Sequence, residues 1–566
     1  MNPSSRQVGH ELALAVALAA ALFVLLLGGL LAWNEVQGKV STLVNSGELT
    51  RLHEELRTRP KDEALKEKIR HLDLQLRTST FYRLQLSRKG VRALLLGLAA
   101  FLVSAHAVRR YRRQPPDPTT WGARQPEREA RQWRLARYAV AALCLATASA
   151  AWLLSLQPVR LPERAAAPPG GAPDFPSREE VLRNWPAFRG PNGSGVAPAA
   201  SVPLAWDVKT GLNIRWTTAI PLHGFSSPII WSNSVFLTGA NSASSVVYRL
   251  DADSGALLWT AAVKLPGGVR LPTPKVAENN SLAAPTPVTD GRRVYAIFPN
   301  GAIAAFDFSG RQVWACNIGP LDNSYGYAAS LSIFTVALMV QIDRGAAEDG
   351  LSKMLALDTR TGRILGQARR EVAASWASPI VVEINGQPQL LTCAAPFVIA
   401  YDPANGKELW RNKCLESDVA PSPIYASNIV VVVAPNNAII GLHPGETGIV
   451  WKAEDGVPDA TSPVSDGTRL YIVNSEGLLT CYNLQTGKVL WTHEFETPFY
   501  ASPAIAGNVL ILLNFKGVAH LLALGDKYSP LGQGTVGEVC GASPVPLGTR
   551  LYIRGQQHLF CIESKP

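Results

Sequence analysis

The residue types that most often perform chemistry are scattered along this chain. Its seven cysteines are far apart and form no Cys-x-x-Cys pair, and its nine histidines show no metal-ligand spacing. Nucleophile-elbow, zinc-protease, P-loop and dinucleotide-binding motifs do not occur in the sequence. We therefore predict no catalytic residue and no metal site. We expect the cysteines to be buried thiols, with one disulfide as the alternative.

An aspartate recurs in several repeated strings, together with a glycine and a tryptophan. Asp251, Asp307 and Asp402 precede the glycine by three or four residues and the tryptophan by seven or eight. Because a catalytic group is needed once and not in every repeat, we interpret these aspartates as caps of their own turns. The tryptophans are interpreted as structural residues that pack between repeats. That set is Trp216, Trp259, Trp314, Trp410, Trp451 and Trp491.

A second group of aromatic residues stands near recurring Ser/Thr-Pro pairs. If those pairs belong to strands that face a central channel, the aromatic side chains line its mouth and bind a peptide or a flat ligand. The alternative is packing at the junctions between repeats. These candidate binding residues are Phe225, Tyr325, Tyr327, Trp376, Phe499 and Tyr500.

The segment 184–195, NWPAFRGPNGSG, is a further candidate. Two glycines and a proline around Asn192 predict a tight turn. We interpret the segment as a latch that holds the start of the folded domain against the repeats. A ligand-binding role of Arg189 is the alternative. The latch residues are Trp185, Phe188, Arg189 and Asn192.

The elements that must position these residues follow from a repeat. The prolines of successive Ser/Thr-Pro pairs are 40 to 44 residues apart over most of the C-terminal part, and a degenerate unit lies around Ser330. Each unit also contains a hairpin pattern and a final strand, which together predict a four-stranded blade. A single blade cannot bury both of its faces, so blades must stack radially. The count of inner strands predicts eight blades.

The last predicted blade lacks an outer strand at the C-terminal end of the chain. Residues 214–219 have the pattern of an outer strand without a preceding blade. We therefore expect them to complete the last blade and close the ring, which removes open sheet edges. The predicted fold class is an all-β, eight-bladed β-propeller closed by an N-terminal outer strand and preceded by an α-helical membrane module.

The membrane module is predicted from apolar runs in residues 1–160. Transmembrane helices are expected at about 12–33, 91–108 and 139–156, with an extramembrane helical hairpin at about 45–88. The arginine-rich loop before the third run predicts an integral protein of the inner membrane, whose C-terminal domain lies in the periplasm or another extracytoplasmic space. A linker rich in proline and alanine is expected at 161–180, and the propeller at 181–566.

The charge of the chain is unevenly distributed. The first 165 residues carry a net charge of +12, whereas the remainder carries −2. A nucleic-acid-binding domain needs its basic residues on its own folded surface. The charge therefore argues against a nucleic-acid partner.

At its repeats the sequence resembles the PQQ-binding-like β-propeller repeat proteins. The strings NWPAFRGPNGSG, DTRTGRIL, SWASP and YDPANGKELW carry this resemblance, which extends over residues 184–566. One branch of that family, the quinoprotein dehydrogenases, implies PQQ and calcium, but its vicinal cysteine pair is missing from this sequence. The other branch, the propeller of the outer-membrane barrel-assembly machinery, implies a lipoprotein scaffold without a cofactor. Size and short loops resemble the second branch more closely.

The resemblance and the residues together predict a membrane-anchored scaffold that binds a protein or peptide partner in envelope assembly. No cofactor is expected, and an enzymatic role is disfavoured. Two alternatives remain open at this point. One is a quinoprotein dehydrogenase, an oxidoreductase that uses PQQ with calcium. The other is a ligand sensor coupled to the membrane helices.

Overall fold

The structure is a computed structural model that describes residues 13–24, 27, 101–108 and 175–564. Single positions are left out of the last range, namely 270, 278, 279, 320, 322, 324 and 417. The chain divides into two units, Met1–Gly170 and Gly171–Pro566, which are described separately.

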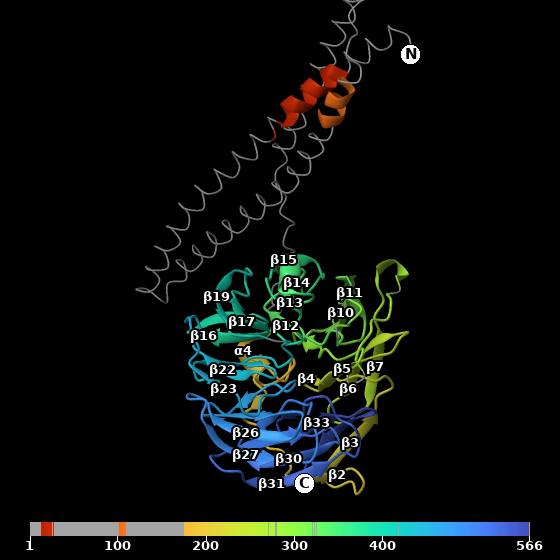
Figure 1. Cartoon of the computed structure of the whole chain (residues 1–566). Helices are drawn as coiled ribbons and strands as arrows, with labels where there is room; N and C mark the ends of the chain where they lie inside the picture. Colours follow the sequence, from red (N-terminus) through yellow and green to blue (C-terminus); the bar gives the residue numbers. More distant parts are fainter. Residues whose placement is uncertain are drawn as a thin grey trace, which may run out of the picture. The chain divides into compact units, whose positions relative to one another are not determined.

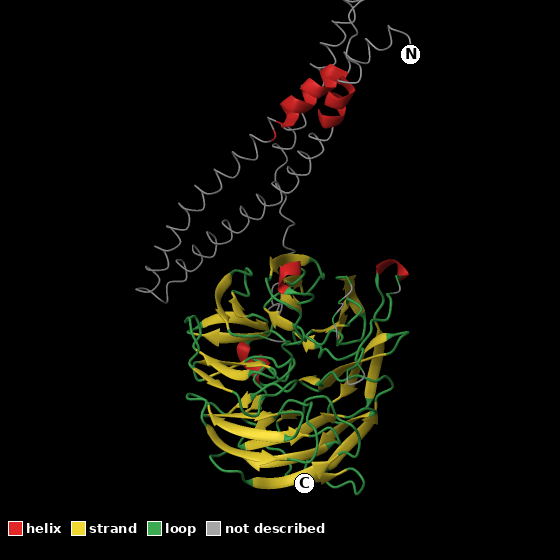
Figure 2. Cartoon of the chain, viewed as in Figure 1, coloured by secondary structure: helices red, strands yellow, loops and turns green. Residues whose placement is uncertain are grey.

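The described part of the first unit consists of helical residues at 13–24, 27 and 101–108 (Figure 2). Among the residues that the structure describes, no helix has both the length and the apolar character needed to cross a membrane. The expected helix at 139–156 and the expected hairpin at 45–88 lie outside the described residues. The predicted fold class, with its three transmembrane helices, is therefore corrected to an all-β architecture with few helices.

The second unit begins with the short helix α4 (Arg178–Leu182). Ser177 caps this helix in a capping box with Glu180, whose carboxylate accepts from the Ser177 backbone N–H over 2.8 Å. Two 3-10 turns lie in loops further on, η2 (Pro266–Gly268) and η3 (Ala347–Asp349). The remaining elements in the described range of this unit are strands.

The strands form eight sheets within the described residues. Blade 1 contains β4 (Ile229–Trp231), β5 (Ser234–Ala240), β6 (Ser245–Asp251) and β7 (Leu257–Ala262). Blade 2 contains β8 (Val288–Thr289), β9 (Arg293–Ile297), β10 (Ala302–Asp307) and β11 (Gln312–Asn317). Blade 3 contains β12 (Ser332–Phe334), β13 (Ala337–Ile342), β14 (Lys353–Asp358) and β15 (Ile364–Arg369). Blade 4 contains β16 (Ile380–Ile384), β17 (Gln387–Ala394), β18 (Phe397–Tyr401) and β19 (Glu408–Lys413).

The second half of the ring repeats this order. Blade 5 contains β20 (Ile424–Ala426), β21 (Ile429–Ala434), β22 (Ala438–Leu442) and β23 (Trp451–Ala453). Blade 6 contains β24 (Val464–Ser465), β25 (Arg469–Val473), β26 (Leu478–Asn483) and β27 (Val489–Glu494). Blade 7 contains β28 (Ala504–Ala506), β29 (Val509–Leu513), β30 (Val518–Ala523) and β31 (Pro530–Thr535), flanked by β1 (Val196–Ala197) and β2 (Ala205–Asp207). Blade 8 contains β32 (Val545–Leu547), β33 (Arg550–Arg554), β34 (His558–Ile562) and β3 (Ile214–Ala219).

The outer strands of the eight blades follow one another around the rim of the ring (Figure 1). Middle strands read as continuous apolar runs because both faces of a blade are covered. In β21, Val430 and Val432 pack into the core shared with blade 4, whereas Val431 and Val433 pack into the core shared with blade 6. This alternation follows from the two-residue period of a strand. The blades therefore adhere face to face by burying apolar side chains.

Outer-strand tryptophans join each blade to the next. Their Nε1 atoms donate to backbone carbonyls of the following blade over 2.9–3.1 Å. The pairs are Trp216–Ala252, Trp259–Phe308, Trp314–Thr359, Trp451–Leu484 and Trp491–Gly525. The turn glycine that follows the repeated aspartate allows this contact. At Gly310, for example, an added Cβ would lie 2.9 Å from the Trp259 ring. Trp410 is an exception, because it donates to Gln389 of its own blade over 2.8 Å.

The junction of blades 3 and 4 is built differently, because Gly366 stands where β15 would carry its tryptophan. A fully buried ion pair lies here, in which Arg370 Nε donates to Asp343 Oδ1 over 2.8 Å. The same guanidinium donates to Thr392 Oγ1 and the Tyr401 hydroxyl of blade 4, over 2.6 and 3.3 Å. Hydrogen bonds therefore replace indole packing at this junction.

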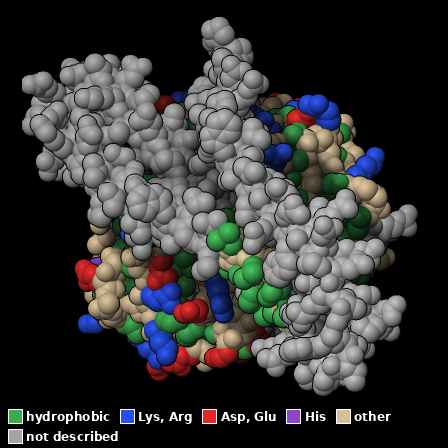
Figure 3. Space-filling view, turned by 90° about the horizontal axis from the view of Figure 1, so that it is seen from above, with side chains coloured by type: hydrophobic (Ala, Val, Ile, Leu, Met, Phe, Trp, Pro, Cys, Tyr) green, Lys and Arg blue, Asp and Glu red, His purple; other side chains and the backbone are tan. Residues whose placement is uncertain are grey.

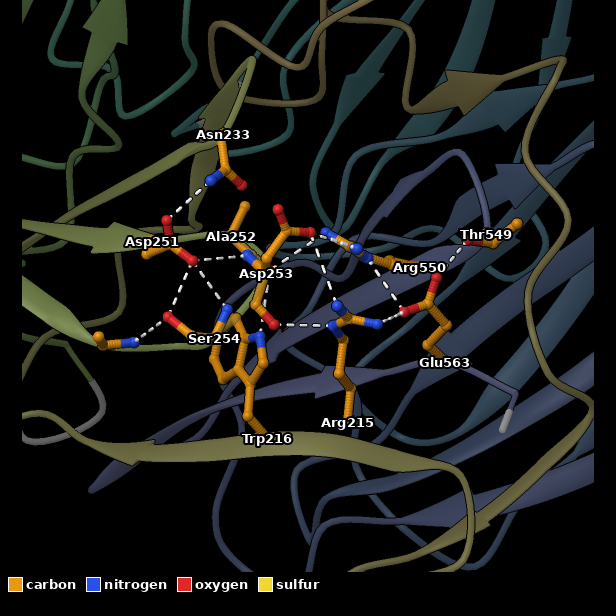
Figure 4. A network of polar contacts seen from close by, with 11 residues as sticks. Arg215, Trp216, Asn233, Asp251, Ala252, Asp253, Ser254, Thr549, Arg550 and Glu563 are labelled. Carbon is orange, nitrogen blue, oxygen red and sulfur yellow. Dashed lines mark hydrogen bonds and ion pairs between the residues drawn. The ribbon is translucent and has the colours of Figure 1, made fainter. Parts of the chain in front are cut away.

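The ring closes where β3 pairs antiparallel with β34, in register Trp216 to Cys561. The observed strand occupies the residues predicted for it. A polar network spans the closing junction (Figure 4), with Arg215 Nε donating to the Asp253 carbonyl over 2.8 Å and Arg550 bonded to the Asp253 carboxylate over 2.6 Å. Blade 8 is thereby joined to blade 1 by the same indole contact and by ion pairs.

On the face seen in Figure 3, charged side chains of both signs are interspersed with apolar ones. The cysteines in the described range are free thiols, several of them buried within the blades.

Candidate functional site

A closed ring of hydroxyl groups surrounds the centre of the propeller. In each blade one Ser or Thr hydroxyl, which belongs to a Ser/Thr-Pro pair in every blade except blade 3, accepts a hydrogen bond from the backbone N–H of the equivalent residue in the preceding blade. The eight bonds are 2.9–3.1 Å long. The ring residues are Ser227, Thr286, Ser330, Ser378, Ser422, Ser462, Ser502 and Ser543. In seven blades the residue after the hydroxyl is a proline, which has no N–H to donate, whereas Leu331 follows Ser330 in blade 3.

The hydroxyl ring lines a central cavity of about 650 Å³. Volumes of this size hold a small ligand or a few side chains. All eight ring residues are buried, and all of them line the cavity. The centre of the propeller is therefore a hollow with a polar girdle.

Residues 185–195, which we call the plug, close one end of this cavity. The Trp185 backbone pairs with Ile230 of blade 1, and the Pro186 carbonyl accepts from Thr289 of blade 2 over 2.9 Å. The Gly195 carbonyl accepts from Ile505 of blade 7 over 2.9 Å. Gly193 of the plug lies against Ile380 of blade 4, where an added Cβ would meet the isoleucine side chain, so the plug reaches across the ring. Phe188 of the plug lines the cavity.

Arg189 fastens the plug from within. Its guanidinium is buried and donates to the carbonyls of Pro463 in blade 6 and Pro503 in blade 7, over 2.5 and 3.1 Å. Two further bonds reach the carbonyls of Gly193 and Ser194 in the plug itself. Arg189 thus has the contacts of a structural fastener. Burial lowers the pKa of this guanidinium to about 9.

A second buried guanidinium lies beside blades 8 and 1. Arg554 donates to the carbonyl of Ser226 over 2.9 Å and also contacts its hydroxyl oxygen. Burial lowers its pKa to about 9 as well. Neither Arg189 nor Arg554 lines the cavity.

The residues two positions before each ring hydroxyl decide the shape of the mouth. They are aromatic in blades 1, 4 and 7 and small in the other five blades. In order from blade 1 to blade 8 they are Phe225, Ala284, Ala328, Trp376, Ala420, Ala460, Tyr500 and Gly541. Large side chains therefore wall the mouth in three places and leave room between them.

Four of the six predicted aromatic residues meet at this cavity. Phe225, Tyr325, Trp376 and Tyr500 line it, and Tyr325 is 52% exposed at the rim. The Trp376 indole donates to the Gly326 carbonyl over 2.9 Å and lies edge-on to Tyr325 with ring centroids 5.2 Å apart. Its orientation is therefore fixed.

Tyr327 and Phe499 lie elsewhere, in the core. The Tyr327 side chain is buried, and its hydroxyl donates to the Gln341 carbonyl over 2.8 Å. Phe499 is fully buried between blades 6 and 7. Of the predicted latch, Trp185 and Arg189 are buried, Phe188 lines the cavity and Asn192 is exposed.

The sequence analysis missed two carboxylates in the lining, Asp418 of blade 5 and Asp459 of blade 6. The sequence signal for them is their position shortly before the ring hydroxyl of their own blade, which Asp418 precedes by four residues and Asp459 by three. Lys, Arg and His are not among the described residues of the lining. The mouth is therefore aromatic and acidic.

The residues of the cavity do not fit PQQ with calcium. PQQ carries three carboxylates, whereas this lining offers no cationic side chain and two aspartates. Within the described residues, no group of three or more His, Cys, Asp or Glu side chains is placed to hold a metal ion.

Comparisons with known proteins agree with this architecture. The family model described as outer membrane protein assembly factor BamB matches residues 201–330, 350–465 and 448–527, which is more than half of the chain. A protein of that name from Burkholderia pseudomallei is 20% identical over 401 residues, covering 63% of this chain and 87% of its own length. Its counterpart from Bordetella pertussis is 22% identical over 350 residues, covering 58% of this chain and 78% of its own.

A solved structure gives the same fold. The quinohemoprotein alcohol dehydrogenase from Comamonas testosteroni matches with a TM-score of 0.51 at 12% identity, covering 68% of this chain and 81% of that one. At this identity the likeness concerns the fold alone.

Proposed function

The chain belongs to the family described as outer membrane protein assembly factor BamB, and from this premise we propose that its propeller is a protein-binding scaffold in outer membrane protein assembly. This role puts the propeller in the periplasm. The scaffold holds a partner and does not itself perform a reaction.

The observation that carries the proposal is the blind cavity at the centre of a closed ring. The plug closes one end, so a partner reaches the cavity from the mouth alone. Fixed aromatic side chains such as Trp376 provide contact area at little cost in conformational entropy. Eight interlocked blades hold these side chains in place, which preorganises the mouth for binding.

A quinone-dependent oxidoreductase is not supported by this site. Its cofactor needs cationic partners and a metal-binding donor set, and the described lining offers neither. The resemblance in fold to quinohemoprotein dehydrogenases is compatible with a scaffold, because one fold hosts unrelated functions.

Photo-crosslinking in the organism that encodes the chain tests the proposal. A photoreactive amino acid is placed at Tyr325, on the rim of the cavity, and for comparison at Ile364, which is 61% exposed on β15. We expect a protein adduct from position 325 that is weak or missing from position 364. Depletion of the chain should lower the amount of folded outer membrane proteins. Unchanged levels together with no adduct from position 325 would refute the proposed function.

A further inference from the structure

Two carboxylates at the cavity mouth have no partner within the described part of the chain. Asp418 and Asp459 are exposed, and neither side chain makes an ion pair or a hydrogen bond with another described residue. Several other carboxylates of the propeller are paired, as Asp253 is with Arg550 and Glu408 with Arg411. The mouth therefore presents negative charge that the propeller itself does not neutralise.

Aromatic side chains flank these carboxylates on both sides along the ring. Trp376 of blade 4 precedes Asp418 of blade 5, and Tyr500 of blade 7 follows Asp459 of blade 6. We call these four residues the carboxylate niche. Tyr500 lies edge-on to Phe515 with ring centroids 5.1 Å apart, so both aromatic walls are held by neighbours.

Small residues keep the niche open. Blades 5 and 6 carry Ala420 and Ala460 at the position where blades 4 and 7 carry Trp376 and Tyr500. A side chain that enters over these alanines reaches the part of the lining that carries both carboxylates and two of the aromatic rings. Carboxylates attract a cation by charge, and aromatic faces attract it through their quadrupole.

The remaining surroundings favour a cation on a long, flexible stem. The lining has no Lys, Arg or His among its described residues, and the buried guanidinium groups of Arg189 and Arg554 are bonded to oxygen atoms of the inner strands. The cavity of about 650 Å³ is closed by the plug, so it admits side chains and not a folded domain. Lysine and arginine carry their charge at the end of such a stem.

We propose that the carboxylate niche binds a lysine or arginine side chain from an extended segment of the partner protein. This inference rests on the function proposed above and names the chemistry by which the partner is recognised. The hydroxyl ring below offers hydrogen-bond donors to the backbone carbonyls of the same segment, since none of its hydroxyl hydrogens has an acceptor among the described residues.

A binding assay with the full chain tests the inference. The probe is a fluorescently labelled Gly/Ser peptide that carries three lysines, compared with the same peptide carrying three glutamates. The test variant combines Asp418→Asn with Asp459→Asn. The matched control combines Glu348→Gln with Glu446→Gln, which removes two exposed carboxylates outside the cavity. Tyr500→Leu tests the aromatic wall, and thermal unfolding confirms that each variant is folded.

We expect the lysine peptide to bind and the aspartate pair to weaken its binding about tenfold, because two ion pairs worth about a factor of three each are lost. The control pair should change affinity by less than about twofold, and Tyr500→Leu should weaken it about threefold. Added salt should weaken binding to the native chain.

Several results would overturn the inference. These are equal weakening by both pairs, tighter binding of the glutamate peptide, or no binding of the lysine peptide to the native chain. Spermidine that binds as tightly as the peptide would also overturn it, since the niche would then recognise a free polyamine. If the partner adduct from position 325 persists in the aspartate variant, the scaffold function stands while this inference fails.

Discussion

Removal of the Arg189 guanidinium tests how the plug is held. Replacement by methionine keeps an unbranched side chain but removes every donor. The carbonyls of Pro463 and Pro503, in two different blades, then lose their charged partner. The Gly193 and Ser194 carbonyls of the plug lose theirs as well.

The magnitude follows from the two carbonyls of the ring blades. A buried carbonyl left without a donor costs about 1–3 kcal/mol, so two of them cost about 2–6 kcal/mol. Part of this is offset because the variant no longer buries a charge, whose unfavourable desolvation lowers the pKa of Arg189 to about 9. We therefore expect Arg189→Met to lower the free energy of unfolding by about 3 kcal/mol. For a domain of this size that is a fall in Tm of roughly 4 °C.

Differential scanning calorimetry of the full chain measures the effect. Asn192→Ala is the matched control, because Asn192 belongs to the same plug but is exposed. We expect this change to stay within about 0.5 kcal/mol. A loss below about 1 kcal/mol in Arg189→Met, or a loss equal to that of the control, would show that the guanidinium does not fasten the plug.

Three further predictions concern the ring. Trp216→Ala should lower the free energy of unfolding, measured by denaturant titration, by about 3–5 kcal/mol, because the buried indole joins blade 8 to blade 1. The control Leu258→Ala, at an exposed position, should change this free energy by less than about 0.5 kcal/mol. Gly310→Ala should lower the free energy of unfolding by about 1–3 kcal/mol more than Gly386→Ala. Both glycines have positive φ, but of the two only Gly310 places the new Cβ against an indole. Equal losses of stability in the two variants would contradict that contact. Burial lowers the pKa of His520, so the stability that this histidine contributes is present above pH 6.5 and is lost as the pH falls below that value. His520→Leu should therefore reduce the decline in Tm on the acid side. An unchanged decline would refute the assignment to His520.

A buried ion pair holds blade 3 where the outer-strand tryptophan is missing. Blade 3 lacks its outer-strand indole at Gly366, yet the buried pair of Asp343 and Arg370 ties it to blade 4. Such a pair destabilises strongly when one partner is removed, because the other charge stays buried. The two kinds of junction are therefore not interchangeable by single substitutions.

The repeating architecture could be predicted from the sequence alone. The spacing of Ser/Thr-Pro pairs, the glycine turns and the tryptophans recur because every blade solves the same local packing problem. The closing strand at 214–219 could be assigned because the last blade visibly lacked one. Apolar length alone misled the prediction of transmembrane helices, since no helix in the described residues is long and apolar enough to span a membrane.

Which side chains face the cavity follows from the three-dimensional arrangement and could not be predicted from the sequence. Phe499 and Tyr500 are neighbours in sequence, but one lies in the core and the other lines the mouth, because successive side chains of an extended chain point in opposite directions. Tyr325 and Tyr327 separate because Gly326, at φ +85°, turns the chain between them. Pairing over long sequence distances is likewise not encoded locally. Arg189 meets carbonyls 274 and 314 residues away only because the ring brings blades 6 and 7 to the plug, just as it gathers the carboxylate niche from four blades.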